Sequence, residues 1–139
     1  MKTSRDTFTD LDRGMPGWFI FSAWFLPVGI LGQFLSAGSA LFHDSGLWGL
    51  HVAAGGILVL PAIALLVGAL SVPRLRGFGW WASLIFIIYL IQVALAVETM
   101  PLLLSVHPFN GALLLSASLV LLAKVERRRA QALSMETFQ

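Results

Sequence analysis

Four long apolar stretches are the feature of this sequence that most limits how it can fold. Short polar segments separate them, and they cover residues 17–42, 47–70, 78–97 and 106–123. An α-helix rises about 1.5 Å per residue, so about 20 residues cross the hydrocarbon core of a bilayer. Lipid offers no partner to an open strand edge, which leaves the helix as the form for each stretch. The sequence therefore predicts four transmembrane helices.

The composition favours lipid over water as the solvent for most of the chain. Hydrophobic residues make up 58% of the sequence and charged residues only 12%, whereas an ordinary soluble domain carries about 25% charged residues. So few charges cannot cover a water-facing surface, and they exclude a disordered chain and a nucleic-acid partner. The sequence has no cysteine, which excludes disulfides, iron–sulfur clusters, thiolate metal sites and thiol catalysis.

The nine lysine and arginine residues predict an orientation. All of them lie before the first stretch, between the second and third, or after the fourth, whereas segments 43–46 and 98–105 contain none. By the positive-inside rule both termini are cytoplasmic and these two segments face outward. We therefore expect a multi-pass protein of the inner (plasma) membrane, with the lipid bilayer as its first partner.

The few polar residues inside the stretches form a repeat. Each half of the chain has a glutamine, an outer segment, a histidine and a glycine four residues later: Gln33, His51 and Gly55, then Gln92, His107 and Gly111. The halves, 17–70 and 78–123, run in the same direction through the membrane, which is typical of a parallel repeat. The sequence predicts one all-α domain over residues 1–139, a four-helix up-down bundle of two helix-hairpin repeats.

The repeat places the two histidines at a similar depth near the outer face. Short connections make successive helices neighbours, so the second and fourth helices lie diagonally, farther apart than the roughly 8–10 Å of packed helices. We expect His51 and His107 to face each other across this gap and to bind the iron of one haem. Gly55 and Gly111 share the face of their histidine. They would leave room for the edge of the macrocycle or, alternatively, let helices approach closely.

Further polar residues have expected roles around the histidines. Each histidine is expected in the first turn of its helix, where the positive end of the helix dipole keeps an imidazole neutral, as a metal ligand must be. Hydrogen bonds from Gln33, Gln92 and Asn110 would orient the rings, although the glutamines could equally join helices. His43, in the polar segment beside Asp44, is expected to be solvated or to cap the loop.

The glutamine-bearing helix, the outer segment and the opening His-x-x-x-small of the next helix resemble one four-helix half of the haem A synthase family. The resemblance covers about residues 30–120 and implies that His51 and His107 are the axial ligands of a haem. Members of that family carry a carboxylate close to the first histidine, and many have a cysteine pair in an outer loop. Here residues 47–50 hold no carboxylate and the sequence has no cysteine. The resemblance therefore implies a bundle that holds haem, not an enzyme that modifies it.

These observations predict a b-type cytochrome-like membrane protein with one haem b near the outer face, for electron transfer or haem handling. The sequence shows no catalytic constellation, which favours an electron carrier or haem-binding protein over an enzyme. One haem in one leaflet would need a quinone, an outside redox partner or a second redox protein. A second copy of the chain is a further partner to consider.

The alternative hypothesis is a cofactor-free accessory subunit of a larger respiratory or photosynthetic complex, or one that binds a chlorophyll-type pigment through a single histidine. A transporter or channel is the weakest candidate, because the predicted spans lack intramembrane charges and a polar stripe.

Overall fold

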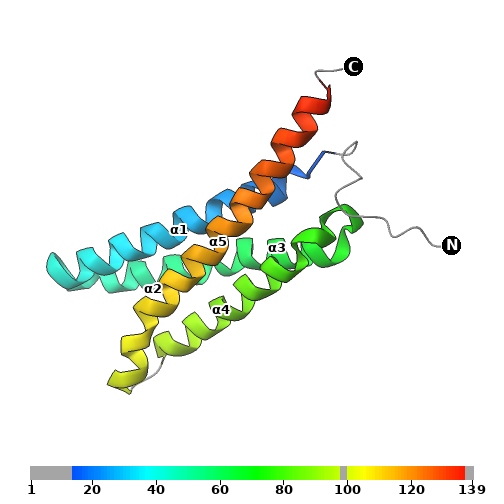
Figure 1. Ribbon diagram of the computed structural model, residues 1–139. Coiled ribbons are helices and arrows are strands. Elements are labelled where there is room, and N and C mark those ends of the chain that lie inside the picture. The colour runs from blue at the N-terminus through cyan, green and yellow to red at the C-terminus, as the bar shows by residue number, and fades with distance from the viewer. Residues whose placement is uncertain (1–13, 98–99, 137–139) are drawn as a thin grey trace.

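The computed structural model describes residues 14–97 and 100–136, and this part of the chain is helical with no strand (Figure 1). In chain order the elements are α1 (Gly17–Phe42), the short 3₁₀ helix η1 (Ser45–Leu47), α2 (Trp48–Ile57), α3 (Val59–Ser71), the 3₁₀ helix η2 (Pro73–Phe78), α4 (Gly79–Val97) and α5 (Pro101–Glu136). The elements η1, α2 and α3 follow one another as a single rod, so the described residues form four helices long and apolar enough to cross a membrane. Residues 1–13, with three of the cations used to predict orientation, and residues 98–99 of the predicted outer segment lie outside the described residues.

The first and third predicted stretches agree closely with observed helices. Helix α1 covers the same residues as the first stretch, and α4 begins one residue later than the third. The second stretch is interrupted at Leu58, between α2 and α3. There the Leu58 N–H donates to the Gly55 carbonyl, at 3.3 Å, in a tighter turn. Pro61 has no N–H for the helical bond that would run across this point, which explains the interruption.

The fourth helix is longer than predicted at both ends. Helix α5 has 36 residues, from Pro101 to Glu136, and so extends beyond the apolar stretch 106–123 in both directions. Pro101 takes the first helical position, where its missing N–H is not needed. His107 consequently lies in the second turn of α5, directly before Pro108, and not in the first turn. The effect of the helix dipole fades within the first turn, so it is weaker at His107 than at His51, which lies in the first turn of α2.

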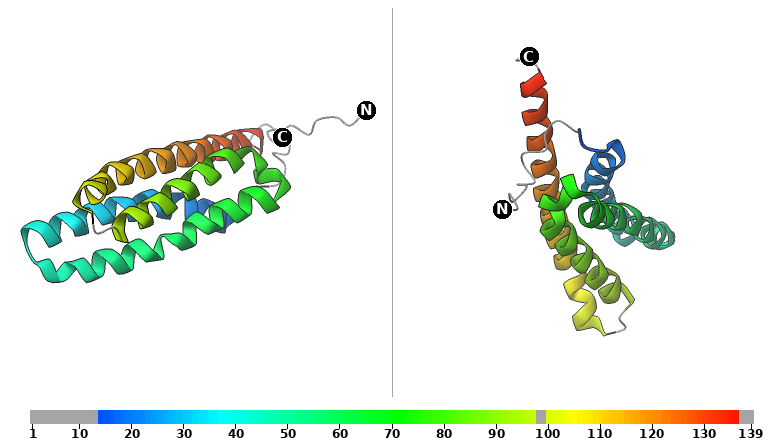
Figure 2. Two further views of the ribbon diagram at one scale, coloured as in Figure 1. Left: turned by 90° about the horizontal axis from the view of Figure 1, so that it is seen from below. Right: turned by 90° about the vertical axis from the view of Figure 1, so that its right-hand side faces the viewer.

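The helices pack as a ring of neighbours. Helix α1 contacts α2, α3 and α5, and α4 contacts α3 and α5. The rod of α2 and α3 therefore lies diagonally opposite α5, and successive helices run in opposite directions (Figure 2). Gly68 shows how tightly α1 and α3 approach, because a Cβ atom there would lie 2.5 Å from Cη2 of Trp18 and 3.0 Å from Cδ2 of Phe19.

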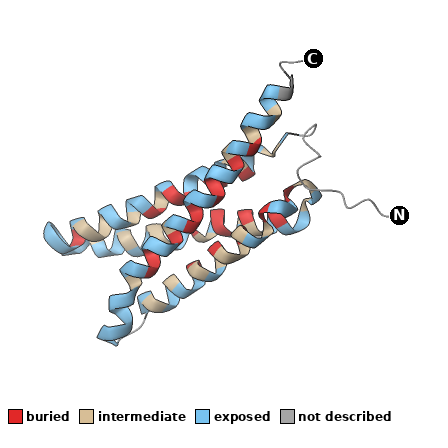
Figure 3. Ribbon diagram, viewed as in Figure 1, coloured by how far each residue is buried: buried red, intermediate tan, exposed pale blue. Residues whose placement is uncertain are grey.

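The packed core occupies only one end of the bundle. Each helix contributes a fully buried side chain there: Leu26 of α1, Leu65 of α3, Ile85 of α4 and Leu121 of α5. Toward the other end the hairpin of α1 and α2 diverges from the hairpin of α4 and α5 (Figures 1 and 2). Most residues at the diverging end are exposed (Figure 3). Large apolar side chains such as Phe21, Leu35, Leu60 and Trp80 also cover the outside of the bundle, which is compatible with a lipid environment.

Candidate functional site

Two imidazole rings from diagonally opposite helices meet beside the core. The ring centroids of His51 in α2 and His107 in α5 are 6.4 Å apart, with 65° between the ring planes, and both residues are half-buried. Metal–nitrogen bonds are about 2.0–2.1 Å long, so two imidazoles on opposite sides of one metal have centroids about 6.4 Å apart. The observed separation is therefore in the range that a shared metal needs.

The His107 ring is held by Gln92 of α4. Its Nδ1 lies 3.1 Å from the Gln92 main-chain carbonyl, and its Nε2 lies 3.1 Å from the Gln92 amide nitrogen. A carbonyl can only accept, so Nδ1 carries the hydrogen and Nε2 accepts from the amide. Asn110 fixes that amide by donating from Nδ2 to Gln92 Oε1, at 2.7 Å, and to the Ile88 carbonyl, at 3.1 Å. Removal of the Gln92 amide from Nε2 would leave this nitrogen available to a metal.

The His51 ring is held in a similar way by α1. Ser36 Oγ lies 3.0 Å from His51 Nδ1 and donates to the Gln33 carbonyl, also at 3.0 Å. The Ser36 hydroxyl thus contacts the His51 ring at Nδ1 and helps to hold it against α1. The edge of His51 also meets the Trp48 ring, with centroids 5.5 Å apart. In both histidines Nδ1 is held by a neighbouring helix, and a hydrogen bond at one ring nitrogen orients the ring, as it does in metal-bound histidines.

The side chain of Gln33 also contacts the second helix of its hairpin. With its amide nitrogen directed at α2, it donates to the His51 carbonyl at 2.9 Å and to His51 Nδ1 at 3.2 Å. Its oxygen accepts from the Gly55 N–H at 3.1 Å. Gln33 therefore joins α1 to α2 beside the histidine.

The two glycines make room for the glutamine amides. A Cβ atom on Gly55 would lie 3.1 Å from the side-chain amide of Gln33, and one on Gly111 would lie 3.2 Å from Gln92 Nε2. The sequence left two roles open for these glycines, room for the edge of a macrocycle and close approach of helices. The contacts with the glutamine amides correspond to the second role. The structure thus brings the predicted site residues together in two groups, in each of which the glutamine contacts the histidine and lies beside the glycine, although through different atoms: Gln33, His51 and Gly55 in one hairpin, Gln92, His107, Asn110 and Gly111 in the other.

His43 lies apart from this cluster. It follows α1, is exposed, and its N–H donates to the Ser39 carbonyl at 2.9 Å. The neighbouring Asp44 accepts from the Gly46 N–H at 2.8 Å and so caps η1. This placement agrees with the loop role expected for the segment.

Two residues of the site were missed by the sequence analysis. Ser36 lies three residues after Gln33 and therefore on the same helix face, which is the signal that could have identified it. Tyr89 is the single tyrosine of the sequence, within an apolar stretch. Its hydroxyl donates to the Gly55 carbonyl at 3.0 Å, next to the interruption at Leu58. Tyr89 thus connects α4 to the helix that carries His51.

The described residues contain no group of three or more histidine, cysteine, aspartate and glutamate side chains that could hold a metal ion. Two imidazoles alone are too few for a stable zinc or copper centre. Two imidazoles are enough for a metal whose other ligands belong to a cofactor, such as the iron of a porphyrin.

Comparison with known proteins gives one family match. Residues 33–100 match a family of unknown function, DUF6220. The matched part contains Gln33, Ser36, His51, Tyr89 and Gln92 and ends before His107. Comparisons with curated proteins and with solved structures find no match. Nothing found links the chain to haem A synthase, so that resemblance stays a prediction.

Proposed function

We propose that this chain is an integral membrane protein of the inner (plasma) membrane, built from two parallel helix-hairpin repeats with both termini in the cytoplasm. Four apolar helices, apolar side chains over the outside of the bundle and the one-sided distribution of lysine and arginine support this proposal. The proximity of a glutamine, a histidine and a glycine in each hairpin supports the repeat.

We further propose that the protein holds one haem b between His51 and His107. The observation that carries this proposal is the 6.4 Å separation of the two rings. Binding of a haem iron to His107 Nε2 requires the Gln92 amide to move away from this nitrogen. Haem, when bound, supplies one-electron redox chemistry. The chain's own contribution is to orient both rings through Ser36 and the Gln92 carbonyl and to shield them beside the apolar core.

A haem held near one face serves electron transfer or haem handling. Electron transfer at that depth needs a quinone or an outside redox protein, or a second haem protein such as another copy of the chain. The polar contacts also favour a second candidate, a cofactor-free subunit of a larger complex. In this candidate the bonds of His107 to Gln92 serve only to join α4 to α5.

The deciding experiment is the visible spectrum of the protein purified in detergent after growth with ample haem precursor. We expect the sharp reduced bands of a six-coordinate haem, their loss in His51→Ala and His107→Ala, and their retention in His43→Ala. Circular dichroism of each variant separates loss of haem from loss of helix. A colourless wild-type protein would favour the cofactor-free subunit, and a long-wavelength band would indicate a chlorophyll-type pigment.

Membrane topology has its own test, because the sequence has no cysteine that would react in the background. Ser45→Cys places a thiol between α1 and α2, and Ser134→Cys places one near the end of α5. A membrane-impermeant maleimide should label the first variant in intact cells and the second only after the membrane is opened. The reverse pattern would overturn the orientation.

A further inference from the structure

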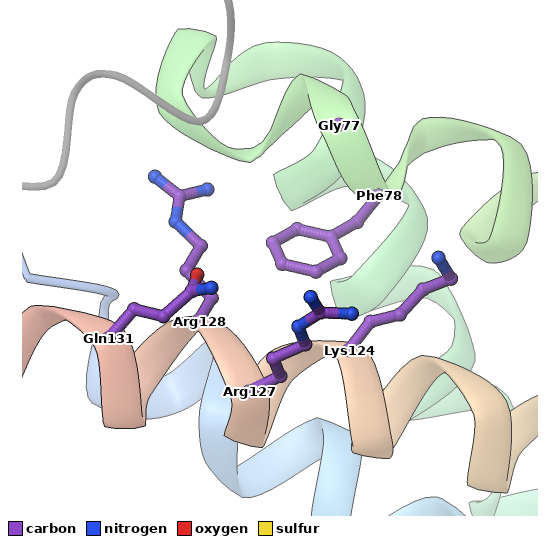
Figure 4. A pocket seen from close by; sticks show the side chains of 6 residues that line it. All are labelled: Gly77, Phe78, Lys124, Arg127, Arg128 and Gln131. Atoms are coloured by element: carbon purple, nitrogen blue, oxygen red, sulfur yellow. The ribbon is translucent and has the colours of Figure 1, made fainter.

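A second polar site lies far from the histidines, where η2 meets α5. A pocket of about 260 Å³ is lined there by Gly77, Phe78, Lys124, Arg127, Arg128 and Gln131. Figure 4 shows the long side chains rising from α5 toward Phe78. Lys124 lies 17 residues after His107 in the same helix, which is about 25 Å along the helix axis. The pocket and the histidine pair are therefore separate sites.

The lining of the pocket is cationic and rich in hydrogen-bond donors. Three of its six residues are lysine or arginine, Gln131 adds an amide, and none of them is a carboxylate. Next to the pocket, Arg129 forms an ion pair with Glu126 at 2.9 Å. Neither of these residues lines the pocket. Such a donor set recognises an anion with several oxygen atoms, since guanidinium groups bind phosphate with paired hydrogen bonds.

Aromatic rings and a buried arginine give this pocket a fixed shape. Arg128 is only 5% exposed, lies 5.7 Å from the Phe78 ring centroid and donates to the Arg74 carbonyl. Arg128 thereby ties η2 to α5. Lys124 Nζ lies 5.9 Å from the Trp81 ring centroid. Lys124 and Arg127 are exposed, so they can reach a ligand without a change in the core.

The position of the pocket along α5 indicates where its ligand comes from. Lys124 directly follows the apolar residues 111–123 of α5, and Trp80 and Trp81 lie at the start of α4. If the four helices cross a membrane as proposed, this level is the cytoplasmic boundary, where tryptophan and basic side chains meet lipid headgroups.

We propose that this pocket binds a phosphate group, supplied by the headgroup of an anionic phospholipid. Arg127 and Lys124 contact the phosphate oxygens, and Gln131 donates a further hydrogen bond. The pocket thereby fixes the cytoplasmic end of α5 against η2 and the lipid surface. Free inorganic phosphate carries the same chemistry and is the second source that the experiment separates.

The test uses the full chain purified in detergent and titrated with phosphatidylglycerol or phosphatidylcholine, with lipid adducts counted by native mass spectrometry. We expect the anionic lipid to bind in preference to the zwitterionic one. Each cation near a membrane surface contributes about fivefold in affinity for anionic lipid. Lys124→Gln combined with Arg127→Gln should therefore weaken phosphatidylglycerol binding by about 25-fold.

Arg129→Gln is the matched control, because it removes one charge from the same turn of α5 outside the pocket. It should leave lipid binding within about twofold of wild type. Equal binding in the double variant and wild type would overturn the proposal, as would an equal loss in Arg129→Gln. If the double variant is not helical by circular dichroism, Arg127→Gln alone, with an expected loss of about fivefold, replaces it.

A third titration uses inorganic phosphate alone. If phosphate at millimolar concentration displaces phosphatidylglycerol, the pocket recognises the phosphate group itself. This result supports the site and indicates free phosphate as its ligand. Lipid binding that phosphate does not displace, and that the double variant loses, supports the headgroup as the source. The haem spectrum is recorded in parallel, so failure of this site and failure of the histidine site are seen independently.

Discussion

The amide nitrogen of Gln92 lies 3.1 Å from Nε2 of His107, the ring atom that a haem iron would take. The same glutamine accepts from His107 Nδ1 through its main-chain carbonyl, also at 3.1 Å. Gln92 therefore both prepares the ring, by fixing the hydrogen on Nδ1, and competes for its free nitrogen. These two roles can be separated, since only the second depends on the side chain.

Replacing Gln92 with leucine should tighten haem binding. The main-chain bond to Nδ1 remains, and the competing hydrogen bond, worth roughly 1 kcal/mol, is lost, which corresponds to about fivefold in haem affinity. The haem-free protein should become less stable by about 2 kcal/mol, because it loses both the bond to His107 Nε2 and the bond accepted from Asn110, each worth about 1 kcal/mol. Haem titration followed by thermal unfolding measures both effects. Weaker haem binding in Gln92→Leu would show that the amide assists the haem instead of competing with it.

Replacing Ser36 with alanine should weaken haem binding without unfolding the bundle. Ser36 Oγ lies 3.0 Å from His51 Nδ1, and loss of such a partner typically lowers metal affinity by about 10- to 100-fold. Ser39 provides the control, because it lies one turn later in α1 and is exposed. Haem titration of Ser36→Ala and Ser39→Ala should show the loss in the first variant alone. Equal affinities would mean that Ser36 does not orient the ring.

Replacing Gly68 with alanine should destabilise the bundle. The new Cβ would lie 2.5 Å from the Trp18 ring and 3.0 Å from the Phe19 ring, and such overpacking costs about 1–3 kcal/mol. Gly32→Ala is the matched control, since nothing lies within 4 Å of a Cβ there and alanine favours the helix by up to about 1 kcal/mol. Thermal unfolding in detergent should therefore show opposite shifts. A stable Gly68→Ala variant would disprove the tight contact between α1 and α3.

Replacing Tyr89 with phenylalanine removes one hydrogen bond and keeps the buried ring. The hydroxyl donates to the Gly55 carbonyl at 3.0 Å, and interhelical hydrogen bonds in membranes contribute on average about 0.6 kcal/mol. We expect a loss of stability of this size, measured by unfolding in detergent. A loss above about 2 kcal/mol would indicate that the interruption at Leu58 depends on this bond.

Much of the fold could be predicted because lipid restricts the choices. Apolar length alone located α1 and α4, and short connections made successive helices neighbours. The start of α5 could not be read in the same way, since Glu98, Pro101 and Ser105 all resemble loop residues in a sequence. Pro101 in fact suits the first turn of a helix, so the loop before α5 is shorter than its composition indicates.

Part of the site could be predicted, because the apolar stretches contain few polar residues and each of them is easily noticed. His51, His107 and their glutamines stood out for this reason, and the structure places them together. Serine is too common in membrane helices to draw attention, so Ser36 was missed. The neighbour of each glycine also depends on how the helices rotate about their axes, which periodicity does not reveal.

The bundle is closed at one end and open at the other, and this asymmetry has a mechanical consequence. The buried side chains around Leu65 and Leu121 hold the two hairpins together at the packed end. Each hairpin carries one of the two histidines. A small change in the angle between the two hairpins alters the distance between the two imidazole rings. Substitutions at Leu65 or Leu121 should therefore change what fits between His51 and His107.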